Sequence, residues 1–257
     1  MIKGLYTAAS GMMVQMARQD AIANNLANVN TSGYKKHVAV SRAFPEMLMS
    51  RLGESTENAR GETKAQPPEF IGRLGTGACM DEVYTDFTAG NIKKTDNSSD
   101  IALSGPGFFA VETADGERFT RCGEFKINSD GMLTTSEGYP VLDNFDNYIF
   151  IEDEFTVDRL GNIIVNGEEI ARLKIINFEN LQAMERLGDS LLNSNEEYME
   201  IENPDVLQGY VEESNVNAVK EMVTLISVVR AYEAMQKAVQ AVDETTQVAL
   251  DKVGSVT

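Results

Sequence analysis

The chain has 257 residues, 42% hydrophobic and 24% charged, which is enough for one large domain or two smaller ones with a hydrophobic core. Its 40 Asp and Glu outnumber its 22 Lys and Arg, and the formal net charge is -18. Such a balance offers no broad basic surface to a phosphate backbone, so we expect no nucleic-acid partner.

The N-terminal sequence MIKGLYTAASGMMVQ is interrupted by Thr7, Ser10 and Gln15. It therefore lacks the continuous apolar core of a cleaved secretory signal. No stretch approaches the roughly 20 apolar residues that a membrane span needs, and we expect no membrane insertion.

The first predicted element is an amphipathic helix over residues 1–32, because apolar or small residues recur there at steps of three and four. The positions of this stripe are Ile2, Leu5, Ala9, Met12, Met16, Ala23 and Leu26. The Thr31-Ser32 pair and Gly33 predict the end of the helix.

Residues 33–71 are predicted to be a connector that becomes ordered mainly by contact, since a Pro67-Pro68 pair and scattered glycines interrupt it. Within it the run MLMSRL, which begins at Met47, is expected to form a short helical piece.

Residues 72–208 predict a β-rich domain of antiparallel strands. Its short runs FFAVET, RFTRC, EFKIN and RLKIINF are separated by dipeptides typical of tight turns. These are Asp115-Gly116, Asp130-Gly131, Glu137-Gly138 and Asn166-Gly167. The glycine-rich GRLGTG, from Gly72 to Gly77, lacks the lysine of a phosphate loop and predicts a turn that leads into a strand.

The last predicted element is a second long helix within residues 209–257, with Asn217 as its N-cap. Its apolar or small stripe comprises Leu225, Val228, Tyr232, Met235, Val239, Val242 and Ala249, with polar Thr246 interrupting it. The fold class is therefore α+β, with a β-rich middle between two long helices that can pair. Because these stripes bury little area per turn, the helices should be marginal alone.

The candidates for chemistry are weak. His37 is the only histidine, which excludes a Ser-His-Asp triad and a cluster of His ligands, and we interpret it as a solvated loop residue. Cys79 and Cys122 lack metal-ligand spacing. We expect both to be ordinary, partly buried residues, with a single disulfide bond as the alternative.

The acidic run from Leu142 to Glu154 fails the calcium-loop pattern, because Phe145 and Tyr148 stand where an oxygen ligand and a glycine are needed. We interpret it as solvated turns and faces. The sequence thus predicts no catalytic, cofactor-binding or metal-binding residue.

Three motifs carry a resemblance. IANNLANVNTSGYKK, from Ile22, resembles the N-terminal motif of bacterial flagellar rod and hook proteins, with Tyr34 at its aromatic position. GYVEESNVNAVKEMVTLISVVRAYEAMQKAV, from Gly209, resembles their C-terminal motif. DIALSGPGFFAVETADGERFTRCGEF, from Asp100, resembles the body segment of rod proteins. The chain is therefore similar to the flagellar rod, hook and hook-associated axial proteins.

The resemblance implies a structural subunit without a cofactor, exported by the flagellar type III apparatus without a cleaved signal. It implies assembly with copies of itself and other axial proteins into the helical tube of the rod, in the periplasm and cell-wall space. In that family the terminal segments pair as a coiled-coil inner domain, here 1–32 and 209–257, and the β-rich middle, here 72–208, is the outer domain.

Within the family, the length and the opening GLYTAASGMM favour the rod proteins over the longer hook protein. The segment FPEML, from Phe44, and the compact body favour the proximal rod component, with the distal rod component as the alternative.

The resemblance also implies an assembly interface. Its candidate residues are Leu5, Met12, Met16, Asn24, Asn25, Leu26, Asn28, Asn30, Gly33, Tyr34, Ser214, Asn215, Val216, Leu225, Tyr232, Glu233, Met235 and Val239. We expect the four asparagines to set the register between neighbouring helices, because their amides both donate and accept hydrogen bonds. The alternative is a frayed, solvated helix end stabilised by local caps.

Two other functions remain as alternatives. One is an enzyme acting on the cell wall through acidic residues such as Glu124 or Asp130, although their spacing does not favour it. The other is a soluble adaptor or chaperone whose helices bind exported proteins.

Overall fold

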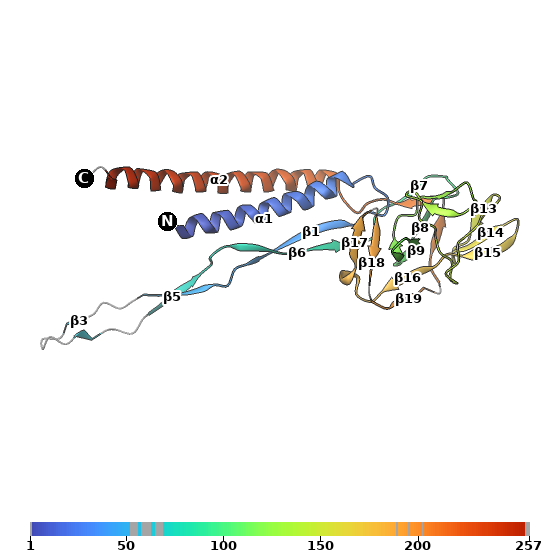
Figure 1. Ribbon diagram of the computed structural model, residues 1–257, viewed down its shortest axis with the longest axis horizontal. Coiled ribbons are helices and arrows are strands. Elements are labelled where there is room, and N and C mark those ends of the chain that lie inside the picture. The colour runs from blue at the N-terminus through green and yellow to red at the C-terminus, as the bar shows by residue number, and fades with distance from the viewer. Residues whose placement is uncertain are drawn as a thin grey trace. The chain divides into compact units, whose positions relative to one another are not determined.

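The structure is a computed structural model that describes residues 2–51, 56–57, 63–64, 69–188, 190–194, 196–201 and 203–254. Two long helices lie at the two ends of the sequence, and many antiparallel strands lie between them (Figure 1). The predicted α+β class is confirmed.

The helices are α1 (Ile2–Ala27), the short 3₁₀ turn η1 (Leu181–Ala183) and α2 (Ala218–Gly254). The strands of the first hundred residues are β1 (Lys36–Ala43), β2 (Met47–Arg51), β3 (Thr56–Glu57), β4 (Thr63–Lys64), β5 (Glu69–Leu74), β6 (Ala78–Asp86) and β7 (Ile92–Lys94). The next strands are β8 (Ile101–Leu103), β9 (Phe108–Thr113), β10 (Gly116–Thr120), β11 (Phe125–Ile127), β12 (Leu133–Thr135), β13 (Phe155–Val157) and β14 (Asn162–Val165). The last are β15 (Glu168–Arg172), β16 (Ile175–Phe178), β17 (Glu185–Gly188), β18 (Leu191–Asn193), β19 (Tyr198–Glu200), β20 (Val206–Gln208) and β21 (Tyr210–Glu212).

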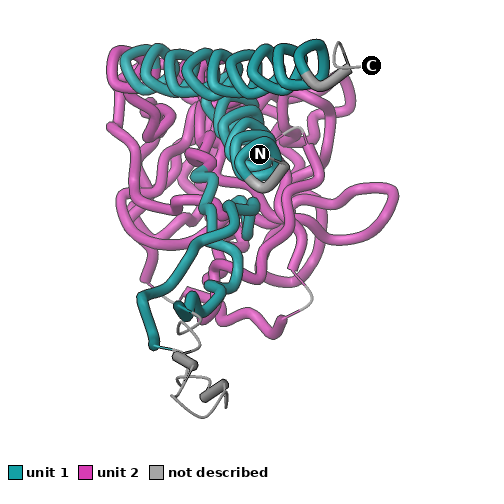
Figure 2. Tube along the Cα trace, turned by 90° about the vertical axis from the view of Figure 1, so that its left-hand side faces the viewer, with its two compact units in different colours: residues 1–23, 38–83, 222–257 teal, residues 24–37, 84–221 magenta. Residues whose placement is uncertain are grey.

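The chain forms two compact units, which Figure 2 colours separately. Unit 1 comprises residues 1–23, 38–83 and 222–257, and unit 2 comprises residues 24–37 and 84–221. Each unit is thus built from stretches that are far apart in the sequence.

Unit 1 holds most of α1 and α2 together with a long two-stranded ribbon, in which β1 pairs with β6 and β2 pairs with β5 (Figure 1). The helices approach each other closely at Gly11, where an added Cβ would lie 2.7 Å from the Sδ of Met235. A glycine at this position lets the thioether pack against the backbone of α1. Figure 2 shows the two helices of this unit crossing at an angle.

The helical piece predicted for MLMSRL is wrong, because Met47–Arg51 is strand β2. Met47 pairs with Leu74 and Arg51 with Glu69 in an antiparallel register. A helix of six residues is marginal in water, whereas pairing with β5 satisfies the backbone groups of the same residues. The predicted Pro67-Pro68 stop lies outside the described residues.

Helix α1 ends at Ala27, earlier than the predicted end near Ser32. The side-chain amide of Asn28 donates to the carbonyl oxygen of Asn24 at 2.9 Å, and such side-chain bonds compete with helix propagation. Gly33 has φ +69°, in the left-handed region, but it follows the helix end by six residues and belongs to the next turn instead of ending the helix. At the other end of the chain the predicted cap is confirmed, since Asn217 Oδ1 accepts from the Lys220 amide at 3.0 Å.

Unit 2 is organised around a six-stranded antiparallel sheet in the order β17-β18-β10-β9-β16-β19. The β9–β10 hairpin turns at the predicted Asp115-Gly116 pair, with Thr113 opposite Gly116. Asn166 and Gly167 both have positive φ, 54° and 87°, as the tight β14–β15 hairpin requires. The run GRLGTG leads into a strand as predicted, but it is not a turn throughout, since residues 72–74 belong to β5 and only residues 75–77 lie between β5 and β6.

Strand β9 distributes its side chains between two hydrophobic clusters because successive residues of a strand face opposite ways. Phe109 and Val111 belong to the larger cluster, whereas Phe108 and Ala110 belong to the smaller one. Phe109 is fully buried and packs edge-on against Phe125, with ring centroids 5.1 Å apart. The core of unit 2 therefore lies on both sides of its central sheet.

The acidic run is only in part the solvated surface that was predicted. Glu152 and Asp153 are exposed, but Asp143 is buried and closes a turn by accepting from the Phe145 amide at 2.8 Å. Asp146 pairs with the buried Lys174 at 2.5 Å. Burial alone would lower the pKa of Lys174, but its bonds to carboxylates outweigh this and raise it. The prediction is wrong for the buried Asp143, whereas Asp146 lies on a solvated turn, with its side chain 68% exposed.

Replacing Phe109 by alanine should destabilise unit 2 by about 3–5 kcal/mol, because the ring is fully buried and leaves a cavity. Phe145→Ala is the matched control, since Phe145 is 83% exposed and its loss should change the free energy of unfolding by less than about 0.5 kcal/mol. Denaturant unfolding of the two variants measures both values. Equal destabilisation would contradict this assignment of the core.

Candidate functional site

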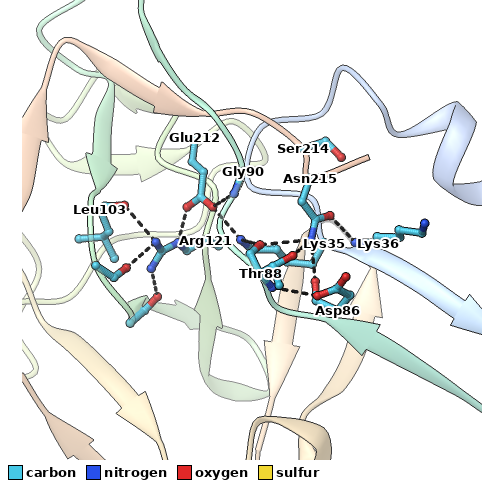
Figure 3. Close-up of polar contacts among 12 residues, drawn as sticks. Lys35, Lys36, Asp86, Thr88, Gly90, Leu103, Arg121, Glu212, Ser214 and Asn215 are labelled. Carbon is cyan, nitrogen blue, oxygen red and sulfur yellow. Dashed lines mark hydrogen bonds and ion pairs between the residues drawn. The ribbon is translucent and has the colours of Figure 1, made fainter. Parts of the chain in front are cut away.

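The central feature of unit 2 is a buried cluster of charges that joins three distant segments, shown in Figure 3. Glu212 in β21 receives Lys35 Nζ at 2.7 Å on Oε1 and the Nε of Arg121 on Oε2. The side chains of Lys35, Arg121 and Glu212 are at most 6% exposed. We call these three residues the motif junction, because each belongs to a different one of the three quoted motifs.

The backbone near Glu212 positions its carboxylate and donates a hydrogen bond to it. Pairing of β21 with β7 places Glu212 opposite Ile92, and the Gly90 amide donates to Oε1 at 2.8 Å. An added Cβ at Gly90 would lie 1.9 Å from the carbonyl oxygen of Glu213. Only glycine lets the backbone approach this closely.

The N-terminal segment reaches the same strand through Gly33, whose amide donates to the carbonyl oxygen of Glu212 at 2.8 Å. A Cβ at Gly33 would lie 2.4 Å from the amide nitrogen of Cys122, which follows Arg121. The neighbouring Ser32 hydroxyl donates to Glu124 Oε1. The turn after α1 is therefore fitted against both the C-terminal strand and the body.

Arg121 extends the motif junction into the loop before β9. Its guanidinium donates to the carbonyl oxygens of Leu103 at 3.0 Å, Gly105 at 2.6 Å and Gly107. A buried guanidinium is tolerated when its donors find acceptors, and here one carboxylate and three carbonyls supply them. Lys35 in turn donates to the carbonyl oxygen of Thr88 at 2.9 Å.

The electrostatics of the motif junction favour charge on Glu212. Burial raises the pKa of this carboxyl, but Arg121 and then Lys35 outweigh burial and hold its pKa below the ordinary value. Glu212 therefore remains a carboxylate at neutral pH. Loss of its charge would leave two buried cations facing a neutral group, which is a costly arrangement.

Asn215 provides a second connection between the same segments (Figure 3). Its Oδ1 accepts from the Lys36 amide at 2.8 Å, and its Nδ2 donates to the carbonyl oxygens of Asp86 at 2.8 Å and Thr88 at 3.1 Å. Lys36 Nζ also pairs with Glu221, in the first turn of α2, at 2.7 Å. The motif around Asn215 is thus engaged within the chain.

Asn25 is fully buried, and its amide pairs with the backbone of His37. It donates to the His37 carbonyl oxygen at 2.8 Å and accepts from the His37 amide at 2.7 Å. The Tyr34 hydroxyl donates to Asn24 Oδ1 at 2.7 Å. These two asparagines fold the chain back after α1, a role that the helix pattern did not reveal.

The candidate interface residues fall into three groups by burial. Buried within the chain are Asn25, Gly33, Tyr34, Ser214 and Val216. Half-buried are Leu5, Met12, Leu26, Asn28, Asn215, Leu225, Tyr232, Met235 and Val239. Exposed are Met16, Asn24, Asn30 and Glu233.

The two helical stripes differ in how closely they match the covered faces. On α2 the predicted positions from Leu225 to Val242 are the less exposed ones. On α1 the buried hydrophobic residues are Val14, Ala21 and Ile22, none of which was in the predicted stripe. A strict seven-residue repeat drifts by about 20° per heptad around a straight helix, so the stripe turns away from the covered face.

The other residues considered for chemistry have structural positions. His37 lies half-buried in β1, so its interpretation as a solvated loop residue is wrong. Cys79 and Cys122 are free and partly buried, as predicted, and burial raises the pKa of Cys122 to about 11.

The described residues contain no group of three His, Cys, Asp or Glu that could hold a metal ion. Over the same residues, no helix is long and apolar enough to cross a membrane.

Sequence reasoning missed the motif junction although its residues lay inside the quoted motifs. Lys35 and Glu212 each stand in a pair of like charges, Lys35-Lys36 and Glu212-Glu213, and nothing in the sequence shows which member of a pair is buried. Nothing local pairs Lys35 with Glu212, because the two are separated by 177 positions.

Three family models match the segments that meet here. "Flagella basal body rod protein" matches residues 5–35, "Flagellar hook protein FlgE/F/G D1 domain" matches 102–168, and "Flagellar basal body rod FlgEFG protein C-terminal" matches 207–252. Together they include every residue of the motif junction.

Similar proteins cover the whole chain. The flagellar hook-basal body complex protein FlhO of Bacillus subtilis is 33% identical over 100% of both chains. The flagellar basal-body rod protein FlgF of Caulobacter vibrioides is 32% identical, also over 100% of both. A flagellar basal-body rod protein FlgG of Buchnera aphidicola is 33% identical over 96% of this chain and 98% of its own.

These matches define the class of protein, which is a structural axial subunit of the flagellum. The chain belongs to the flagellar basal-body rod protein family of the FlgF and FlgG type. It is a structural protein of the flagellar basal body, not an enzyme. This finding sets aside the wall-acting enzyme and the export adaptor.

Glu212→Gln should lower the free energy of unfolding by about 3 kcal/mol, because it leaves two buried cations with a neutral partner. Glu213→Gln is the matched control one residue away. Its carboxylate is 44% exposed and contacts Lys93 at 3.5 Å, so less than about 1 kcal/mol should be lost. Denaturant unfolding at neutral pH compares the two, and similar losses would show that the motif junction is unimportant for stability.

The effect of Glu212→Gln should also depend on pH. The folded-state pKa of Glu212 is depressed, so its contribution to stability is present above the unfolded value of about 4.5 and is lost as pH falls through the folded value. The stability difference between wild type and variant should therefore be constant near neutrality and shrink below about pH 4.5. Unfolding curves at a series of pH values measure this stability difference. A difference that grows on acidification would contradict a depressed pKa of Glu212 in the folded state.

Proposed function

We propose that the chain self-assembles through its terminal helices into the helical tube of the rod and so transmits torque from the motor to the hook. The observation that carries this proposal is the apolar surface left on the helices of unit 1. Met13 on α1 is 72% exposed, and Val223 and Ile226 on α2 are 63% and 53% exposed. Long helices with uncovered apolar side chains gain stability when neighbouring molecules cover them.

In this proposal the terminal segments, 1–32 and 209–257, form a coiled-coil inner domain, 33–71 is a connector, and the β-rich residues 72–208 form the outer domain. The less exposed stripe of α2 and the approach of Gly11 to Met235 support such pairing. Exposed Met16 and Glu233 remain available to neighbouring subunits.

The asparagines divide between two roles. Asn25 is committed to the His37 backbone, and Asn24 Oδ1 accepts from the Tyr34 hydroxyl. A register-setting role between subunits therefore falls to the exposed Asn30, the half-buried Asn28 and the side-chain amide nitrogen of the exposed Asn24. Amides at a helix interface disfavour misaligned packing, because a shifted register leaves their hydrogen bonds unmade.

The mode of assembly follows from the kind of contact. A contact between two different faces, repeated around an axis without closing, generates an open helix of subunits. Because the terminal helices bury few large side chains within one chain, they can stay unfolded during passage through the flagellar type III export apparatus. Ordering them then coincides with assembly.

We propose the proximal, FlgF-type position in the rod, with the distal FlgG-type position as the alternative. The FPEML segment at Phe44 and the compact body favour the first. The near-complete coverage by FlgG of Buchnera aphidicola keeps the second open. A map of an intact basal body with this chain traced distinguishes them by its level in the rod.

Met16→Glu tests the assembly surface, because Met16 is 51% exposed and its replacement should leave the monomer folded. Burying the new carboxylate between subunits should reduce incorporation into basal bodies by at least about tenfold and abolish motility. Leu160→Glu, at a 42% exposed position of unit 2, is the control and should assemble normally. The measurement is the amount of each variant in basal bodies purified from a strain that lacks the native gene. Normal incorporation of Met16→Glu would count against assembly through α1.

A further inference from the structure

His37 contacts a cation in an unusual way. Its Nε2 lies 2.8 Å from Nη1 of Arg186 in β17. A guanidinium can only donate, so Nε2 must be the unprotonated acceptor and the ring proton must lie on Nδ1. The contact therefore requires a neutral imidazole.

Arg186 is the residue through which β17 holds the segment after α1. The same Nη1 donates to the Lys35 carbonyl oxygen at 3.1 Å, and the guanidinium lies over the Tyr34 ring at 4.4 Å from its centroid. The Arg186 side chain thus makes three interactions, with the Tyr34 ring, the Lys35 carbonyl oxygen and the His37 imidazole, and these hold residues 34–37 against β17. We call this arrangement the Arg186 clasp.

The charges around the clasp do not favour a second cation. Within the segment itself, Lys35 and Lys36 flank the site, and the carboxylates that reach them, Glu212 and Glu221, are each paired with one of these lysines. Beside Arg186 on β17 stands Glu185, whose side chain is exposed. From α1, Asn25 contributes only a neutral amide.

We propose that the Arg186 clasp is an acid-released contact. Protonation of His37 removes the acceptor for Nη1 and places a positive imidazolium beside the guanidinium, so His37 separates from Arg186 and the hold of β17 on residues 34–37 weakens. The Asn25 amide still holds the His37 backbone, because its two bonds do not involve the ring. The release is therefore confined to the β17 side of the segment.

The direction of the pH dependence follows from the same contacts. Burial, and then the charge of Arg186, hold the pKa of His37 below its ordinary value of about 6.5. The folded state thus binds fewer protons than the unfolded one just below that value. The clasp is intact above about pH 6.5 and is lost as pH falls through the folded pKa.

The test uses the full-length chain. Because His37 is the only histidine, its imidazole signals can be titrated by NMR without assignment ambiguity. Backbone hydrogen exchange of residues 34–37 and 185–188 is compared at pH 7 and pH 5, corrected for intrinsic exchange, with the β9–β10 hairpin as internal reference. We expect an imidazole pKa below 6.5 and a selective loss of protection at pH 5 in proportion to the protonated fraction that this titration gives.

Two variants sharpen the result. His37→Gln keeps an acceptor that cannot titrate, so its protection should not change selectively between the two pH values. Arg186→Gln should return the imidazole pKa towards its ordinary value. A wild-type pKa at or above 6.5, unchanged protection at pH 5, or the same selective loss in His37→Gln would each overturn the proposal. If His37→Gln does not fold, the wild-type titration alone decides between these outcomes.

Discussion

A single buried carboxylate, that of Glu212, joins three segments of unit 2 that lie far apart in the sequence. It is shared by a lysine that follows the N-terminal helix and by an arginine of the body, and all three side chains are almost fully removed from water. Buried charges are tolerated only in the company of partners, so none of the three segments can take another place without leaving the other two unpaired. Residues 1–23 belong to unit 1, but the residues that follow them, 24–37, belong to the β-rich unit 2. The pairing of Lys35 with Glu212 explains this change of unit.

The polar groups of the family motifs and the apolar side chains of the two long helices are used differently. Charged and amide groups of the family motifs are used inside the chain, at the motif junction and around Asn215 and Asn25. The apolar side chains of α1 and α2 are left largely outside, where neighbouring subunits can cover them. In the proposed rod, polar contacts thus fix the shape of the subunit, and apolar contacts between helices supply the energy of association.

Much of the local structure could be predicted from the sequence, because short-range rules govern it. The dipeptide turns, the strand FFAVET and the Asn217 cap each depend on a few adjacent residues. Strand β2, Met47–Arg51, was missed because a five-residue segment with only three apolar residues fits either a helix or a strand until its partner, β5, is known. The face of α1 was misplaced because small residues surround the helix and the heptad pattern drifts.

The site was less accessible to prediction than the fold. Motif resemblance led to the expectation that the asparagines contact neighbouring subunits, which stays a prediction, and it gave no sign that Asn25 bonds the backbone of His37 within the chain. Pairing of Lys35, Arg121 and Glu212 depends on sheet register and on close backbone approach at Gly33 and Gly90. Such contacts between distant segments are set by the tertiary fold and leave no local pattern in the sequence.

The measurement that tests the central claim most directly is a double-mutant cycle between Lys35→Met and Glu212→Gln, read as free energies of unfolding at neutral pH. If the two side chains form one buried charge cluster, the combined effect should differ from the sum of the single effects by at least about 1.5 kcal/mol. Additive effects within about 0.5 kcal/mol would contradict the account.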